Sequence, residues 1–209
     1  PQAKKTHHQA ARDHLLSTCD WVRLGPKHIE ADALAIYFAE RRGMSALIGL
    51  KDKDLKQAYG TNFINMNEHP RKRTLETTTV LGDVWVKEMA QKRKELDGHG
   101  FKFIMGQTMV GDVSDGYKGL YRYGPVKAVE LLDKCETVNE CIEATLDVYR
   151  KKYPKGHTYK DWNHVEQHVS ADELASQHCQ LAYHERGPKD LTNPIDRFLK
   201  HQPAIFTGY

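Results

Sequence analysis

The sequence predicts an α/β fold, and three observations lead to that prediction. Residues 30–42 carry apolar side chains at helical spacing, two arginines in the last turn, and Gly43 directly after them. This helix leads straight into a short apolar run, residues 44–50, which is typical of a buried strand. A second helical pattern follows over residues 101–111. A helix that feeds a short apolar strand is the repeating unit of an α/β sheet.

Composition sets limits on the class of protein. The chain has 209 residues, 39% of them hydrophobic, which is enough for a packed core. Its 31 basic and 28 acidic side chains nearly balance, so a basic surface would appear only if many of the acids were neutralised by metal. No apolar run of about 18 residues could span a membrane, so we expect an intracellular protein. The four cysteines form no Cys-x-x-Cys pair, and we expect reduced, buried thiols: Cys19, Cys135, Cys141 and Cys179.

The chain opens at Pro1 without a methionine, in a polar and basic stretch. Either an initiator methionine was removed or an upstream segment is absent. The first helical spacing lies over residues 14–22, where three apolar side chains share one side.

Acidic side chains follow the first predicted strand. Asp52 and Asp54 come directly after residues 44–50, at the carboxyl end of the strand, where α/β sheets place their ligands. Glu30 and Asp32 stand at the start of the preceding helix. Each pair alone is weak, because Asp-Lys-Asp is usually a surface turn and acids at a helix start usually complement the helix dipole.

The middle of the chain has weaker patterns. Phe63 and Ile64 suggest a strand, and residues 71–73 suggest a basic turn. Residues 84–96 are compatible with an exposed helix that residues 97–100 interrupt. The basic side chains of that helix are expected to form a solvated face: Lys87, Lys92, Arg93 and Lys94.

Residues 111–132 carry the most specific pattern. Asp112 and Asp115 are three positions apart, so on a helical turn both carboxylates would face the same way. Gly119 and Gly124 bracket a tight turn, and the proline after Gly124 suits the first position of a new helix. Backbone N–H groups at such a turn can hold a DNA phosphate without reading a base.

This stretch resembles the signature of the bacteriophage-type 5′ nucleases, the flap endonuclease and 5′–3′ exonuclease family. The segment Gly-Asp-Val-Ser-Asp-Gly at 111–116 and the Gly-Pro at 124–125 are similar to it. Residues 29–33 resemble the Glu-Ala-Asp-Asp helix start of the family, and residues 51–55 its Asp-Lys-Asp-Leu strand end. A capping box at Ser170 and Glu173 opens a helix over 171–186 that is similar to a closing helix of phage members. The resemblance covers about residues 10–187.

The resemblance implies a PIN-like 5′ nuclease sheet with a helix-three-turn-helix region that grips the DNA backbone. Residues 1–100 would be the C-terminal part of the α/β domain, 101–187 the DNA-binding region, and 188–209 an unassigned extension. A two-ion Mg²⁺ or Mn²⁺ site would hydrolyse phosphodiesters of branched or 5′-ended DNA. Its implied ligands are Glu30, Asp32, Asp52, Asp54, Asp112 and Asp115, the last four being also catalytic; the implied DNA contacts are Lys118, Gly119, Arg122, Gly124 and Lys127. The location would be the cytoplasm of a phage-infected bacterial host.

The chain departs from the family pattern in three places. Ala33 replaces the fourth acid of the helix start, and Arg122 replaces the second glycine of the DNA-binding turn. The family's first strand, with its aspartate, and its Tyr-Lys-x-x-Arg segment do not precede Pro1. A separate N-terminal nuclease fragment could supply them, and cleavage by this chain alone is then expected to be slow.

Two other hypotheses remain at this point. One is a non-catalytic DNA-junction binding protein that kept the fold and the phosphate-gripping turn. The other is a zinc site from His164 and His168 at i, i+4 on a helix with His178 and Cys179 nearby, although this spacing lacks the metalloprotease order.

Overall fold

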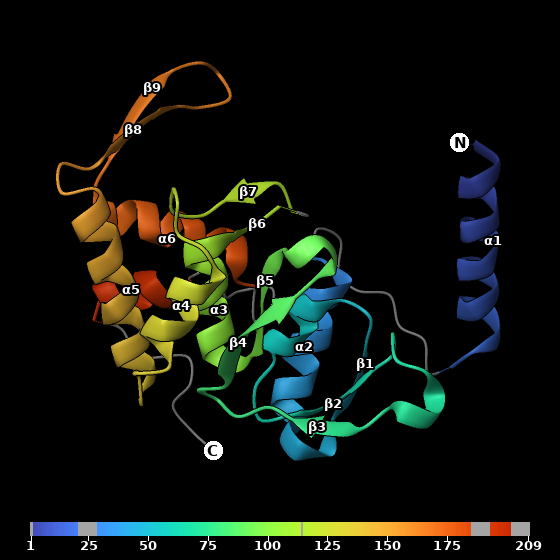
Figure 1. Cartoon of the computed structure of the whole chain (residues 1–209). Helices are drawn as coiled ribbons and strands as arrows, with labels where there is room; N and C mark the ends of the chain where they lie inside the picture. The colour runs from blue at the N-terminus through green and yellow to red at the C-terminus, as the bar shows by residue number, and fades with distance from the viewer. Residues whose placement is uncertain (1, 21–28, 114, 185–192, 202–209) are drawn as a thin grey trace. The chain divides into compact units, whose positions relative to one another are not determined.

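The computed structural model describes residues 2–20, 29–113, 115–184 and 193–201 (Figure 1). The chain divides into two compact units, Pro1–Ala31 and Asp32–Tyr209. The first unit contains helix α1 (Gln2–Thr18), which starts twelve residues before the predicted helix at 14–22 because neither glycine nor proline interrupts it. Residues 21 and 22 of that prediction lie outside the described residues.

The predicted helix and strand at the start of the second unit are confirmed. Helix α2 (Ala31–Arg42) ends at Gly43, whose φ of +53° suits glycine, and a 3₁₀ turn, η1 (Gly43–Ser45), follows. Strand β1 (Leu47–Leu50) is shorter than predicted and only half buried, since its side chains alternate between core and solvent.

A small sheet has the order β1-β2-β3, and its first two strands share an apolar core with α2. Strand β2 (Asn62–Asn65), predicted from Phe63 and Ile64, pairs parallel with β1, and β3 (Leu75–Thr77) pairs antiparallel with β2. The 3₁₀ turn η2 (Lys53–Gln57) leaves the carboxyl end of β1, and η3 (Pro70–Lys72) occupies the predicted basic turn. Side chains from α2, both parallel strands and η2 meet in one apolar cluster.

The predicted helix at 84–96 is wrong. The segment is an antiparallel hairpin of β4 (Asp83–Glu88) and β5 (Lys94–His99), joined through the short turn η4 (Ala90–Lys92). Val84 and Leu96 point into the core, while Gln91 and Lys92 take positive φ angles of 62° and 59°. Left-handed backbone is uncommon at residues other than glycine, and the sequence contains no glycine that would have indicated this turn. The predicted interruption at 97–100 is the end of β5.

The remaining elements are mainly helical. Helix α3 (Gly100–Val110), predicted from its spacing, is buried along nearly its whole length and packs against α4 (Pro125–Leu132), α5 (Val138–Lys152) and α6 (Ala171–Ala182). Phe101, Phe103 and Met105 share one core with Val84 and Leu96, so elements on both sides of residue 100 are packed together. The fold is therefore mixed α/β, with several small sheets.

The capping box predicted at Ser170 and Glu173 is present, and it opens α6. This helix ends at Ala182; residues 185 and 186 of the predicted helix lie outside the described residues. Helix α7 (Pro194–Leu199) comes from the stretch left unassigned, and its Ile195 is fully buried in the main core.

Two short two-stranded sheets complete the described structure. They are β6 (Gly111–Asp112) with β7 (Tyr117–Lys118), and β8 (His157–Lys160) with β9 (Glu166–Val169). Cys135, Cys141 and Cys179 are buried thiols, as predicted, and Cys19 is partly exposed. None of the helices in the described residues combines the length and apolar character that a membrane crossing requires.

Candidate metal centre

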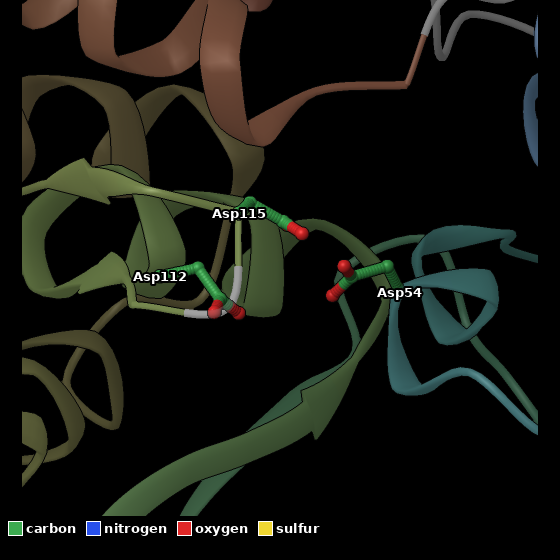
Figure 2. Close-up of side chains that lie close together, drawn as sticks. All are labelled: Asp54, Asp112 and Asp115. Atoms are coloured by element: carbon green, nitrogen blue, oxygen red, sulfur yellow. The ribbon is translucent and has the colours of Figure 1, made fainter. Parts of the chain in front are cut away.

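Three of the predicted acids converge in the structure. Asp54, Asp112 and Asp115 each offer a carboxylate oxygen, and these oxygens all lie within 4.8 Å of one another. Figure 2 shows Asp54 on one side and Asp112 and Asp115 on the other, with their carboxylates directed into the space between them. Asp54 belongs to η2 after β1, whereas Asp112 ends β6 and Asp115 lies in the turn before β7. Asp112 and Asp115 therefore lie at a strand end and in a turn, and not on the helical turn that their spacing suggested.

Close backbone packing positions Asp112. Gly111 ends α3 with a φ of +78° and pairs with Lys118 across β6 and β7. A Cβ on Gly119 would lie 2.3 Å from the Met109 carbonyl oxygen, and one on Gly111 would lie 2.2 Å from the Gly119 nitrogen. Only glycine allows the two segments to approach this closely. Asp112 is thereby fixed at the edge of the buried α3.

A chain of buried amides holds Asp54. The Gln107 side chain of α3 donates a hydrogen bond of 2.6 Å to Asp54 Oδ1. Gln57 Nε2 in turn donates to Gln107 Oε1 at 2.9 Å and to the Ala182 carbonyl at 2.7 Å. Both glutamines are nearly fully buried, so their amides have few alternative orientations. Elements η2, α3 and α6 are thus tied together directly behind the carboxylate.

The carboxylates are crowded, and their pKa values reflect this. Burial raises the pKa of Asp54 from 3.8 to about 6, against the opposing hydrogen bond from Gln107 and with additional repulsion from Asp52 and Asp112. Burial, followed by the charges of Asp112 and Asp52, also raises the pKa of Asp115. Like charges gathered in this way favour either a proton or a bound cation.

Lys53 already supplies one positive charge. Its Nζ lies 2.7 Å from Asp112 Oδ2 and 3.2 Å from Glu95 Oε1. Burial alone would lower the pKa of Lys53, but the hydrogen bonds and charges of Asp112 and Glu95 raise it to about 12. The ammonium group is therefore a built-in counter-ion for one side of the cluster.

The hydroxyl of Tyr117 is a further polar group at the cluster. It is buried and has no hydrogen-bond partner among the described residues. Burial, followed by the charges of Asp112, Asp54 and Asp115, raises the pKa of this phenol well above its usual value, so it remains protonated. A buried donor without a partner is costly to the fold.

The other predicted ligands lie outside this group of three. The Asp52 side chain accepts a hydrogen bond of 3.0 Å from the Asp54 backbone and caps η2, although it is close enough to raise two pKa values. Asp32 lies in the first turn of α2 and does not join the group. Glu30 belongs to the first unit, so its approach to the cluster stays a prediction.

The predicted DNA-binding turn has the expected local form. Gly124 is the N-cap of α4, and Pro125 occupies its first turn. Arg122, in place of the second glycine, takes a φ of +58°. Its guanidinium lies 5.0 Å from the centre of the exposed Tyr121 ring. Lys118, Arg122 and Lys127 are exposed, so their charges are accessible.

A cavity of about 410 Å³ adjoins the cluster. Its lining includes two acids, Glu95 and Asp112, and three cations, Lys53, Arg93 and Lys94. The structure therefore places carboxylates and cations around one open space. This arrangement suits an anionic group that is held while a cation is bound beside it.

The zinc hypothesis is wrong for the described residues. His168 lies on β9 and bonds to Thr158, and His164 is in the turn of the hairpin, so the two do not share a helix face. His178 instead bonds to Tyr149, at 2.8 Å. The only group of potential ligands found in the described part of the chain is the aspartate cluster.

Sequence reasoning missed Lys53, Glu95, Gln107 and Tyr117. Lys53 lies between the two predicted acids, where a lysine beside two carboxylates is a usable signal. No sequence signal pointed to Glu95 or Gln107, because each reaches the cluster only through the tertiary fold. Comparison of the chain with protein-family models, with curated proteins and with solved structures found no match.

Proposed function

We propose that this chain is a divalent-metal-dependent nuclease of the 5′ nuclease type, with a PIN-like sheet and a helix-three-turn-helix region, acting on DNA phosphodiesters. The observation that carries the proposal is the convergence of Asp54, Asp112 and Asp115 from two distant segments. The signature resemblance around residues 111–125 supplies the reaction class.

The donor set suits Mg²⁺ or Mn²⁺. Hard cations prefer carboxylate oxygens, and the three aspartates offer these with the buried Tyr117 hydroxyl nearby. A bound ion would supply charge neutralisation and a more acidic water. Asp54, Asp112 and Asp115 would hold it. A second ion would draw on Asp52 and Asp32, as the resemblance implies.

The residues of the chain itself have separable roles. The buried amide chain through Gln107 fixes the orientation of Asp54, so that carboxylate needs little rearrangement. Arg93 and Lys94, on the cavity wall, would receive the scissile phosphate. The Gly119–Lys127 turn and the start of α4 would hold a neighbouring phosphate of the duplex.

The test is cleavage of a 5′-labelled DNA flap by the chain with Mg²⁺ or Mn²⁺. We compare the parent with Asp112→Asn and with Asp133→Asn, an exposed acid at the end of α4. Cleavage by the parent and by Asp133→Asn, with a loss of about a hundredfold or more in Asp112→Asn, is expected. Mn²⁺ should outperform Mg²⁺, because it tolerates irregular coordination.

The alternative, a non-catalytic DNA-junction binding protein, has one observation in its favour. Lys53 already occupies an oxygen of Asp112, which would serve a site that carries no ion. Metal-independent binding of the flap without any cleavage would support this alternative and would contradict the nuclease proposal. Cleavage that is equal in the parent and in Asp112→Asn would exclude this site as its source.

A further inference from the structure

The β8–β9 hairpin presents a tryptophan at its tip. The strands pair in register from His157 with Val169 to Lys160 with Glu166, and residues 161–165 form the turn. Trp162 in this turn is 88% exposed. Figure 1 shows the hairpin projecting well beyond the helices that carry it. An indole exposed to this degree gains nothing from the folded core, so its place at the tip needs another explanation.

The turn that carries Trp162 is strongly braced. Asp161 Oδ1 accepts hydrogen bonds of 2.9 Å from the backbone nitrogens of both Asn163 and Val165, and Oδ2 accepts one of 3.0 Å from Gln167. The Asp161 backbone N–H also donates to the Val165 carbonyl at 3.0 Å. The shape of the turn is thus set before any partner arrives, which lowers the entropy lost on binding.

Cations surround the base of the hairpin. Lys151 and Lys152 end α5, and Lys155 and Lys160 continue this charge along the hairpin. On the acidic side, the Asp161 carboxylate is occupied by the hydrogen bonds of the turn. The Asp172 carboxylate, at the start of α6, is held by Arg150 at 2.8 and 2.9 Å. Glu166 lies opposite Lys160 in the strand register, so the excess of positive charge lies at the end of α5 and at Lys155, with the aromatic tip beyond it.

This surface continues to the predicted DNA-binding turn. Lys152 Nζ lies 5.4 Å from the centre of the Tyr121 ring, and the Arg122 guanidinium lies 5.0 Å from the same ring. Tyr121 is itself 63% exposed. Aromatic faces interleaved with cations are the composition that binds single-stranded nucleic acid, in which bases stack on rings and phosphates meet the cations.

We propose that the β8–β9 hairpin binds an unpaired strand of nucleic acid by stacking Trp162 on an exposed base, with Lys155 and Lys152 contacting its phosphates. Binding is indifferent to sequence, because every base has a face on which to stack. The inference rests on the proposed function only for the choice of nucleic acid as partner. It needs neither a bound metal nor cleavage.

The experiment uses the full chain in EDTA, so that no metal-dependent step contributes. A fluorescein-labelled 20-nucleotide oligo-dT is the single-stranded probe, and a blunt duplex without unpaired bases is the control ligand. The variants are Trp162→Ala, Trp162→Phe, which keeps a stacking ring, and Val165→Ala in the same turn. Because both positions are more than half exposed, the three variants should fold, and thermal unfolding by circular dichroism checks this.

Trp162→Ala should weaken oligo-dT binding by about 5- to 100-fold, the range expected for the loss of one stacked base. Trp162→Phe and Val165→Ala should stay within about threefold of the parent, and duplex binding should not change in any variant. Bound oligo-dT should also quench part of the tryptophan emission of the parent, and this quenching should be lost in Trp162→Phe, which keeps the other two tryptophans of the chain.

Equal oligo-dT affinity in the parent and Trp162→Ala would overturn the inference. So would an equal loss for the duplex, which would point to a general change in charge or fold. Self-association of the parent that disappears in Trp162→Ala, with oligo-dT affinity unchanged, would assign the tip to a contact between copies of the chain. The two proposals can also fail separately. If Trp162→Ala loses oligo-dT binding as expected but the parent does not cleave the flap, only the nuclease proposal is contradicted.

Discussion

Asp54 carries a charge that its surroundings oppose. Its raised pKa means that the folded chain binds this proton more tightly than the unfolded chain does. Stability is therefore lost as pH rises from the unfolded pKa of 3.8 through the folded pKa of about 6. Two pKa units correspond to about 3 kcal/mol of destabilisation above pH 6. This carboxylate is a cost to the metal-free fold, as is common for groups kept for function.

The first prediction follows from this cost. Asp54→Asn keeps an acceptor for Gln107 and removes the charge, so it should stabilise the metal-free chain. The gain in free energy of unfolding should be about 1 kcal/mol larger at pH 8 than at pH 5. Urea denaturation in EDTA at both pH values measures this, with Asp133→Asn as an exposed control. A gain that is the same at both pH values would contradict the assignment of the charge penalty to Asp54.

Lys53 makes a second prediction at this scale. Lys53→Met leaves the buried Asp112 without its 2.7 Å partner, so the metal-free chain should lose about 2 to 3 kcal/mol. Added Mn²⁺ should then stabilise the variant more than the parent, because the competing ammonium group is gone. The matched control is Lys56→Met, which breaks the buried pair with Asp97 in the same 3₁₀ turn. Thermal unfolding with and without Mn²⁺ compares them, and equal metal effects in both variants would show that Lys53 does not compete at the site.

At the scale of elements, the sequence predicted correctly the features that depend on interactions between neighbouring residues. The α2 helix, the glycine that ends it, the proline that begins α4 and the capping box of α6 are all short-range features, and all were predicted. The β4–β5 hairpin was not, because its apolar residues suit either period and its turn has no glycine. The helix predicted to carry His164 and His168 is wrong for a similar reason. Their spacing matches a helix, but the side chain of Asp161 accepts the hydrogen bonds that set a hairpin turn there.

The glycines beside β6 and β7 give the third prediction. Gly119→Ala places a methyl group against backbone atoms of Met109 and Gly111, which cannot move without shifting α3 or Asp112. We expect a loss of about 1 to 3 kcal/mol in free energy of unfolding and weaker Mn²⁺ binding. Gly124→Ala is the control, because nothing lies within 4 Å of its Cβ position and its φ of −104° suits alanine. The measurements are urea denaturation and Mn²⁺ titration, and an equal effect of both substitutions would contradict the close-packing explanation.

At the scale of the whole molecule, the site depends on contacts that no short window of sequence contains. The order of acidic segments indicated that Asp54, Asp112 and Asp115 would meet, but not that Glu95 and Gln107 would join them. Those two side chains arrive through the β4–β5 hairpin and the buried α3, and the position of both depends on the common core. The sequence thus predicts the ligand residues, whereas the buried residues that hold them in place can be identified only from the fold.

The last prediction concerns the net charge, which is a property of the whole molecule. The chain has a formal net charge of only +3, so duplex DNA should be held by local cations near the Gly119–Lys127 turn and not by overall attraction. Lys127→Ala should weaken duplex binding equally for unrelated sequences and reduce the slope of log K against log salt by about 1. Lys134→Ala removes the same charge just beyond the other end of α4 and should leave the slope unchanged. Fluorescence anisotropy over a salt series measures both. Equal slopes for the two variants would mean that overall charge governs binding, and a loss confined to one DNA sequence would indicate base contacts in place of the phosphate contacts proposed for this turn.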